Sequence, residues 1–301
     1  ETVFGPVDLQ INFPLIKKGL LLTKNKDTFL QTLREKLVVR EEIAYPGYSL
    51  RLQLLGSFTL YMGIHEVEER KWQREKSKEL LTYLYLNKSR FVPKEELIRS
   101  LWKENADEKS SDRDFKVILN ALLKVIEPSR EARGESYFII RKQSMYRLNP
   151  ESVVRSDLET FNDYATLGML EKDASLALEH LLKAVRLYNG SLLEGKPAIE
   201  WISHEREKTE QQYILVLERL AQTSTRLKDF EKTIYWSQKL IHLDHTWEEA
   251  YRLLMFAYYQ LQNRTQAVKW YERCVATLHE ELHVEPMQTT IQMYEMIINY
   301  G

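Results

Sequence analysis

The fold is decided by two neighbouring runs, PKEELIRSLWKENADEKSSDRDFKVILNALLKVIEP at residues 93–128 and YFIIRKQSMYRL at residues 137–148. The first run opens with a proline and a pair of glutamates, which suit the N-terminus of a helix. Its apolar residues then recur at helical spacing until the polar stretch 103–109 interrupts them. Ser110, Ser111 and Asp112 offer capping oxygens for a second helix. This run therefore predicts two short helices joined by a polar turn.

The second predicted helix has two contrasting faces. Phe115, Leu119, Leu122 and Ile126 fall on one face, which we expect to be buried. The opposite face carries Arg113, Val117, Asn120 and Lys124, with Lys116 at its shoulder. The run 137–148 alternates like a β-hairpin with a basic tip at 141–144. A helix–turn–helix followed by a basic hairpin predicts a winged helix whose second helix can enter the DNA major groove.

Several further stretches resemble one known family. They are LRLQLLGSFTL at 50–60, KSKELLTYLYLNKSRFVPKEELIRSLW at 76–102, YRLN at 146–149 and SDLETF at 156–161. They resemble the OmpR-type winged helix of bacterial activators related to the Streptomyces antibiotic regulatory proteins. LYNGSLLEG at 187–195, EWISHEREK at 200–208 and ELHVEP at 281–286 resemble the bacterial transcriptional activator domain that follows it in that family. The motifs occur in the family's order from Leu50 to the end of the chain.

The chain after Asp157 is helical in pattern and internally repetitive. Residues 229–236 and 263–270 align at a period of 34, with Trp236 opposite Trp270. A period of 34 in paired helices is typical of tetratricopeptide repeats, which stack on one another to bury their apolar faces. The sequence thus predicts a mainly α protein with a small β component. A winged helix-turn-helix domain is expected at 50–155 and an all-α tetratricopeptide-like activator domain at 156–301.

Composition fits this organisation. Residues 51–150 hold 20 Lys and Arg against 15 Asp and Glu, whereas residues 151–301 hold 16 against 23. A basic middle and an acidic end suit one nucleic-acid-binding module joined to one that binds something else. Cys274 is the single cysteine, which allows no intrachain disulfide and suits a reducing cytoplasm. The sequence contains no apolar run long enough for a membrane helix, and we expect a cytoplasmic protein.

Residues 1–49 are the least informative part of the sequence. Asp27–Glu42 has the apolar spacing of a helix, and Tyr45-Pro46-Gly47 is typical of a turn or linker. This stretch is interpreted as an N-terminal extension or as the tail of an upstream module. No function is assigned to it.

The resemblance implies a set of DNA contacts. Arg113, Lys116, Asn120 and Lys124 are expected in the major groove. Phosphate contacts are expected from the Ser110 and Ser111 hydroxyls at the helix N-terminus, and backbone or minor-groove contacts from Arg141 and Lys142 on the wing.

One departure weakens the expectation of DNA contact. Relatives commonly carry an R-L-R pattern near the end of this helix, and the matching residues here are Ala121, Leu122 and Leu123.

Two motifs suggest catalysis but lack its context. His279-Glu-Glu-Leu-His283 matches the H-E-x-x-H zinc pattern, yet Pro286 follows closely and no third ligand has family spacing. GSLLEGK at 190–196 approaches a phosphate-binding loop, but Pro197 stands where Ser or Thr would bind magnesium. No enzyme activity, cofactor or metal is expected.

The function predicted from the sequence is a DNA-binding transcriptional regulator, most simply an activator. Its partners are expected to be double-stranded DNA, a second copy of itself, and RNA polymerase or an upstream sensor module. The alternative is a protein–protein adaptor whose degenerate winged helix no longer reads DNA, which rests on Ala121 and Leu123 and on the acidic helical half.

Overall fold

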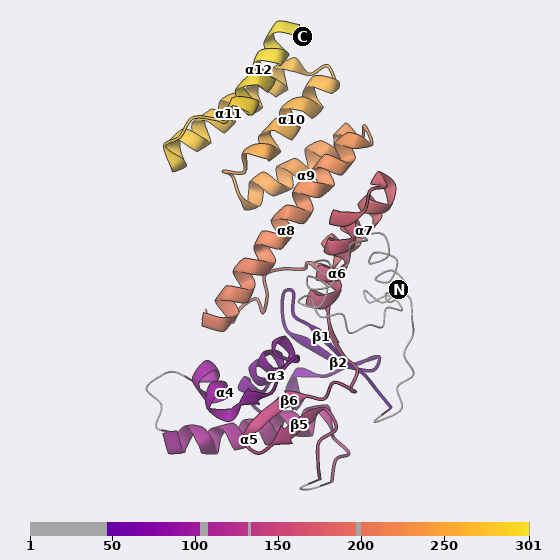
Figure 1. Ribbon diagram of the computed structural model, residues 1–301, viewed down its shortest axis with the longest axis vertical. Helices are drawn as coiled ribbons and strands as arrows, with labels where there is room; N and C mark the ends of the chain where they lie inside the picture. The colour runs from indigo at the N-terminus through magenta and orange to yellow at the C-terminus, as the bar shows by residue number, and fades with distance from the viewer. Residues whose placement is uncertain (1–46, 103–107, 132–133, 197–199, 301) are drawn as a thin grey trace, which may run out of the picture. The chain divides into compact units, whose positions relative to one another are not determined.

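The computed structural model describes residues 47–102, 108–131, 134–196 and 200–300. These residues form a mainly helical protein with two small sheets, as the sequence predicts (Figure 1). They group into two compact units that do not divide at a single point in the chain. The first unit contains residues 47–160 and 189–206, and the second contains 161–188 and 207–300. The helix expected at 27–42 lies outside the described residues.

The helices and strands that begin within residues 47–160 follow the order of a winged helix. In the described part of the chain they are β1 (Leu50–Gln53), β2 (Thr59–Met62), β3 (His65–Glu66), η1 (Glu69–Lys71), α3 (Lys76–Leu86), β4 (Val92–Pro93), α4 (Lys94–Leu101), α5 (Glu108–Ile126), β5 (Ile139–Lys142), β6 (Met145–Leu148), β7 (Val154–Ser156) and the start of α6 (Asp157–Leu170).

Two sheets frame the helices of this unit. In the first sheet the order is β3-β2-β1-β7, with β1 antiparallel to β2 and parallel to β7. In the second the order is β4-β6-β5, with both pairs antiparallel. Gly56 separates β1 from β2 at a φ of +99°, a left-handed value that glycine adopts without strain. The run at 50–60 therefore forms one strand and the start of a second, on either side of this glycine.

Helix α3 is buried almost all round. Leu80, Leu81 and Leu84 are at most 1% exposed, and even Lys78 is only 6% exposed. The Lys78 ammonium lies over the rings of Phe58 and Trp72 and forms ion pairs with Glu69 and Glu75. These contacts stabilise the ammonium charge of Lys78, while apolar surface covers its aliphatic chain.

The hairpin after α5 is the predicted wing, with one difference. Lys142 pairs with Met145 across the strands, so the turn contains only Gln143 and Ser144. Arg141 and Lys142, expected at the tip, instead belong to β5. The tighter turn is possible because Gln143 adopts a φ of +56°.

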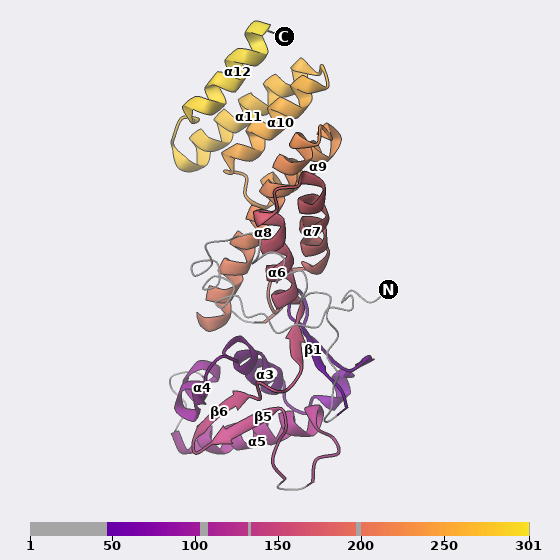
Figure 2. The ribbon, with the colours of Figure 1, turned by 45° about the vertical axis from the view of Figure 1, so that its right-hand side comes forward.

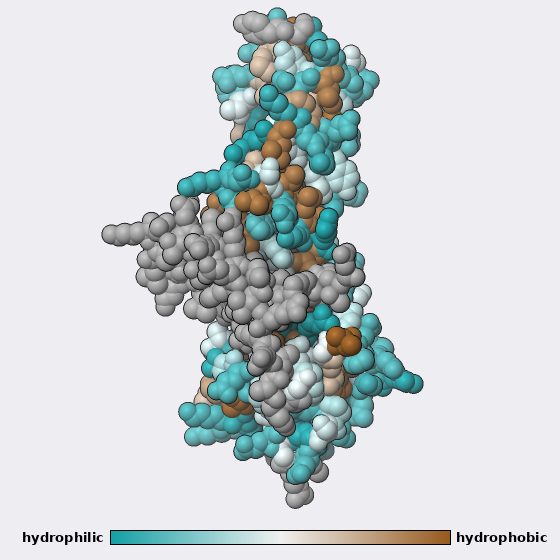
Figure 3. Space-filling view, turned by 90° about the vertical axis from the view of Figure 1, so that its right-hand side faces the viewer, coloured by the Kyte–Doolittle hydropathy of each residue, from teal (hydrophilic) through white to brown (hydrophobic). Residues whose placement is uncertain are grey.

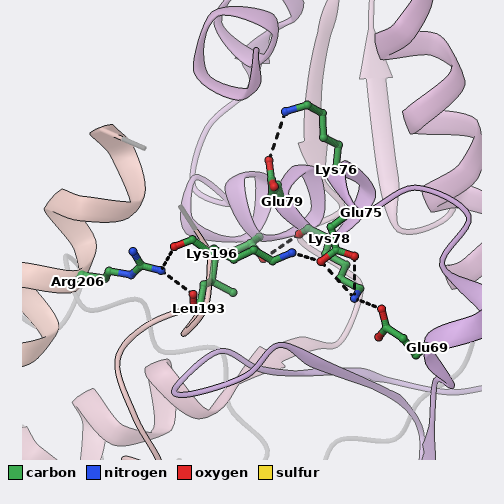
Figure 4. Close-up of polar contacts among 9 residues, drawn as sticks. Glu69, Glu75, Lys76, Lys78, Glu79, Leu193, Lys196 and Arg206 are labelled. Atoms are coloured by element: carbon green, nitrogen blue, oxygen red, sulfur yellow. Dashed lines mark hydrogen bonds and ion pairs between the residues drawn. The ribbon is translucent and has the colours of Figure 1, made fainter. Parts of the chain in front are cut away.

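A segment distant in sequence completes the first unit. The backbone of residues 191–194 pairs with that of 54–56, through Gly56 N–H to Ser191 O at 3.0 Å, Leu193 N–H to Leu54 O at 2.8 Å and Glu194 N–H to Gly56 O at 2.9 Å. Figure 4 shows Arg206 pointing at the backbone of this segment, where its guanidinium donates to the carbonyls of Leu193 and Lys196. Lys196 in turn forms an ion pair with Glu75 beside α3.

The Asp157 side chain also hydrogen-bonds to the backbone of Leu54 and Leu55. Its carboxylate accepts from Leu54 N–H at 2.7 Å, Leu55 N–H at 3.0 Å and Leu158 N–H at 2.8 Å. The side chain is almost fully buried, and burial raises its pKa to about 7 against the lowering effect of these N–H groups. The aspartate of the SDLETF run therefore fixes the strand break at Gly56.

The second unit consists of paired helices. Its described elements are the rest of α6, α7 (Ala174–Leu187), the rest of α8 (Glu200–Arg226), α9 (Phe230–Leu243), α10 (Glu248–Gln260), α11 (Arg264–Leu282) and α12 (Gln288–Tyr300). Figure 2 shows α10, α11 and α12 side by side, and α10 packs on α9, α11 and α12. The 34-residue period is confirmed in the placement of α9 and α11, each of which follows an antiparallel partner.

Helix caps and packed aromatic side chains stabilise this unit. Asp173, Asp229 and Asn263 cap α7, α9 and α11, and each accepts a backbone N–H from three residues on. Tyr188 and Tyr213 stack with their rings 3.8 Å apart. Cys274 is fully buried, and burial raises its pKa to about 12, so its thiol packs in the core as a neutral group.

Gly168 on α6 is required by the close approach of α7. A Cβ built there would lie 2.5 Å from Leu181 Cγ, so the Leu181 side chain would have to move. We expect Gly168→Ala to lower the free energy of unfolding by about 1–2 kcal/mol, because overpacking outweighs the better helix propensity of alanine. Urea unfolding followed by circular dichroism measures this change. The double variant Gly168→Ala, Leu181→Ala should cost less than the two single changes added together, and strict additivity would contradict the contact.

Candidate nucleic-acid interface

Helix α5 is anchored in the first unit by a wide apolar face. Of the four residues predicted on this face, Phe115, Leu122 and Ile126 are fully buried, whereas Leu119 is only half-buried. Ile118 and Val125 add to this face at 6% exposure each. Phe115 packs edge-on against Tyr146 of the wing, with ring centroids 5.1 Å apart. The hydrophobic face therefore fixes the orientation of α5 and leaves the opposite side in solvent.

The solvent face of α5 carries the side chains predicted to read DNA. Arg113, Lys116, Asn120 and Lys124 are all exposed. Val117 lies among them with 45% of its surface exposed, an unusual place for a large apolar side chain. The face thus offers cations, one amide and one aliphatic group, all carried on a single helix.

An ion-pair network edges this face. Asp112 pairs with Lys116 at 2.7 Å, one turn along α5, and with Lys94 at 2.5 Å at the start of α4. Hydrogen bonds from Lys116 and Lys94 lower the pKa of Asp112 to about 2. The contact between Lys94 and Asp112 was not predicted, because the two residues lie 18 positions apart along the chain.

Neutralising Asp112 should strengthen DNA binding. Asp112→Asn removes a negative charge from the face and releases Lys116 to reach a phosphate. We expect affinity for duplex DNA to rise about threefold to tenfold, and the slope of log K against log salt to steepen by about one contact. Fluorescence anisotropy over a salt series measures both. Asp229→Asn, at an aspartate ion-paired with Lys232 in the second unit, is the matched control. A loss of affinity at Asp112→Asn would contradict the prediction.

The two serines predicted to contact phosphate lie inside α5, and only one of them is exposed. Helix α5 already includes Glu108, so Ser110 and Ser111 lie inside the helix and do not precede it. Ser110 is exposed, whereas Ser111 is 2% exposed and faces the interior. The structure therefore removes Ser111 from the candidate phosphate contacts. The prediction was wrong because it placed the turn at 103–109 and started the helix after it, whereas α5 already includes Glu108.

The departure from the R-L-R pattern has a structural counterpart. Ala121 and Leu123 are 6% and 8% exposed and contribute to the packed side of α5. Their small and apolar side chains suit these buried positions. The cationic face of this helix is consequently limited to residues on its other side.

The wing contributes exposed basic groups beside this helix. Arg141 and Lys142 are both exposed in β5. The Arg141 Nε donates to the carbonyl of Gln143 at 2.8 Å, and its guanidinium lies over the Tyr146 ring at 5.9 Å. These contacts hold Arg141 against the hairpin.

Comparison with known proteins identifies part of the chain. Residues 156–298 match the family described as the bacterial transcriptional activator domain. The match covers 143 of the 301 residues. The transcriptional regulatory protein MoaR1 of Mycobacterium tuberculosis is 21% identical over 226 residues, covering 74% of this chain and 72% of that protein. MoaR1 of Mycobacterium bovis matches to the same extent.

A solved structure shares the fold. Mycobacterium tuberculosis EmbR, solved in complex with a low affinity phosphopeptide, superposes with a TM-score of 0.73 at 20% identity over 84% of this chain. The chain spans 66% of EmbR, slightly less than two thirds of its length. The resemblance to activators related to the Streptomyces antibiotic regulatory proteins is thereby confirmed. The relatives compared here are transcriptional regulators.

The activator-domain motifs have structural roles in the described residues. His283 ends α11 in the left-handed conformation, at a φ of +55°, and its Nδ1 lies 3.0 Å from the His279 carbonyl. It is therefore the C-cap of α11 and lies outside the regular helix on which an H-E-x-x-H motif needs both histidines. No group of three or more His, Cys, Asp and Glu side chains in the described residues could hold a metal ion. The GSLLEGK run forms the segment paired with residues 54–56.

None of the helices within the described ranges has an apolar stretch sufficient to span a lipid bilayer. The helical unit does expose hydrophobic side chains, which Figure 3 shows interspersed among polar ones on one of its faces. The larger ones in this unit are Leu176, Leu215, Leu227, Tyr235, Leu243, Leu261, Leu282, Val284, Met287 and Ile298.

Proposed function

We propose that this protein is a DNA-binding transcriptional activator that reads duplex DNA with α5 and steadies itself on the backbone with the β5–β6 wing. The observation that carries the proposal is the division of α5 into a buried apolar face and an exposed face bearing Arg113, Asn120 and Lys124. On a winged helix, such a helix enters the major groove and its exposed side chains meet base edges. No catalytic step is part of this proposal.

The helical unit is proposed to bind protein partners. Its exposed hydrophobic side chains are suited to a second copy of the chain, to RNA polymerase or to an upstream sensor. A sensor is included because EmbR, which shares the fold, was solved with a phosphopeptide. Such a protein acts in the cytoplasm, where bacterial DNA lies.

A salt-series binding assay on genomic fragments tests the DNA proposal. Counterion release makes log K fall linearly with log salt, by about 0.9 for each phosphate neutralised. We expect selective retention of some fragments and a clear negative slope. A folded protein that retains no fragment at low salt would contradict the proposal.

The second candidate function is a protein–protein adaptor. It is favoured by the apolar side chains at Ala121 and Leu123 and by the ion pair that occupies Lys116. The adaptor function predicts that charge reversal at Lys124 leaves a partner complex intact and that the protein shows no salt-dependent binding to DNA. The DNA proposal predicts salt-dependent binding to DNA, which charge reversal at Lys124 abolishes.

Base preference provides a finer test of the reading helix. Asn pairs with adenine in the major groove, and an aliphatic side chain such as Val117 meets the thymine methyl group. We expect Asn120→Ala to remove the preference at one A·T pair of the selected site, a loss of about 1–3 kcal/mol of discrimination. Selection from random duplexes measures it. Gln238→Ala, which removes an exposed amide on α9, should change nothing, and an unchanged preference in Asn120→Ala would contradict the assignment.

A further inference from the structure

An open cavity of about 640 Å³ lies within the first unit, beside the end of α5. Its apolar lining comes from Tyr48, Met62, Val67, Val125 and Pro128. Met62 belongs to β2, Val67 to the loop before η1 and Val125 to the last turn of α5. Tyr48 precedes β1, and Pro128 follows α5. The volume falls within the range of about 300–1,000 Å³ that is usual for small-molecule sites.

The rim of this cavity is mainly basic. Arg70, Lys71 and Lys124 line it together with His65, and Glu66 is the one acidic residue in the lining. Arg70 is ion-paired with Glu68 and mostly exposed. Within the described residues, neither Lys71 nor Lys124 has an ion-pair partner. An apolar interior lined also by two lysines that have no ion-pair partner among the described residues is complementary to a molecule that has an apolar body and a negative head.

We propose that this cavity binds an amphipathic organic anion, with its apolar part against Met62, Val67 and Val125 and its carboxylate or sulfonate between Lys71 and Lys124. Burial of the apolar body supplies affinity in proportion to its area. The lysines supply selection for a negative head, because an uncharged relative of the same shape leaves both ammonium groups unpaired.

Lys124 gives this site a connection to the solvent face of α5. The same ammonium lines the cavity and stands on the face with Arg113 and Asn120. A bound anion would neutralise it and compete with a DNA phosphate for it. This coupling, unlike the cavity site itself, rests on the proposed function. The anion would therefore act as an antagonist of DNA binding.

The probe for this site is 8-anilinonaphthalene-1-sulfonate, an aromatic anion that fluoresces in apolar surroundings, titrated into the full chain without DNA. The uncharged N-phenyl-1-naphthylamine is its matched partner. Met62→Trp and Pro128→Trp each fill the cavity, from β2 and from the segment after α5. Lys71→Glu reverses a rim charge, and Lys228→Glu makes the same change at an exposed lysine of the second unit. Circular dichroism identifies the filled variants that retain the fold.

We expect saturable binding of the sulfonate at one site, about tenfold weaker binding of the uncharged dye, and about tenfold weaker sulfonate binding by Lys71→Glu. A folded Trp variant should lose the site, and Lys228→Glu should match the wild type. Unsaturable fluorescence, or saturable fluorescence that persists in both Trp variants, would overturn the site. Equal affinity for the two dyes would overturn the assignment of an anion.

Selected duplex DNA is then added to the dye complex. Displacement of the sulfonate is the expected result. Retained dye on a protein that still binds DNA would overturn the antagonism and leave the site standing. Dye binding by a protein that binds no DNA at all would instead count against the proposed function alone.

Discussion

The double variant Arg113→Glu, Lys124→Glu is expected to lose sequence-selective DNA binding, with affinity reduced about a hundredfold or more. Each change removes a cation from the exposed face of α5 and places a carboxylate where a phosphate or guanine would approach. Loss of one such base contact costs about 1–3 kcal/mol, and a repelled phosphate adds to that cost. Anisotropy titrations at several salt concentrations should also show a shallower slope for the variant.

The matched control is Lys228→Glu, Lys269→Glu. It changes the net charge by the same amount at two exposed lysines of the second unit. If both double variants lose affinity equally, the effect is one of overall charge, and α5 is not the reader. If neither loses affinity, the winged helix does not contact the DNA. Only a selective loss at Arg113 and Lys124 supports the interface.

Asp157→Ala is expected to destabilise the first unit strongly. It leaves the buried N–H groups of Leu54 and Leu55 without the acceptors they have at 2.7 and 3.0 Å. A buried donor left unsatisfied costs about 1–3 kcal/mol, so the loss should reach about 3 kcal/mol or more. Urea unfolding measures it. Asp173→Ala removes an exposed aspartate that caps α7 and should cost only about 1 kcal/mol. Equal costs would show that burial of the Asp157 acceptors is unimportant.

The same carboxyl predicts a pH dependence of stability. Its pKa is 3.8 when exposed to solvent and about 7 in the folded protein. Because the folded state holds the proton more tightly, its contribution to stability is fully present below pH 3.8 and declines as the pH rises toward 7. Asp157→Asn cannot titrate there. The difference in unfolding free energy between wild type and this variant should therefore shrink from pH 4 to pH 8, and a growing difference would contradict the raised pKa.

The helices and strands were largely readable from the sequence because their signals are local. The wing at 137–148 was predicted because its alternating pattern is typical of paired strands. The 34-residue period likewise located α9 and α11. The exposed face of α5 followed from the same spacing, which is why Arg113, Asn120 and Lys124 were found.

What the sequence did not reveal depends on contacts between distant residues. The ion pair of Asp112 with Lys94 joins two helices across a turn, and no spacing rule links them. Ser111 was assigned to the surface because a serine before an apolar run usually caps a helix, whereas here the helix starts earlier and turns it inward. The cavity beside Lys124 is assembled from separate stretches of chain and has no local signature.

The segment at 189–206 has a consequence for how such proteins can be taken apart and recombined. Because its backbone pairs with residues 54–56, cutting the chain anywhere between 157 and 188 would leave the backbone groups of Leu54 and Gly56 without these partners. A fragment intended to carry the winged helix alone would therefore be less stable than the same residues in the whole chain. A chimaera that exchanges the reader between relatives would need two junctions, so that this later segment travels with its own winged helix.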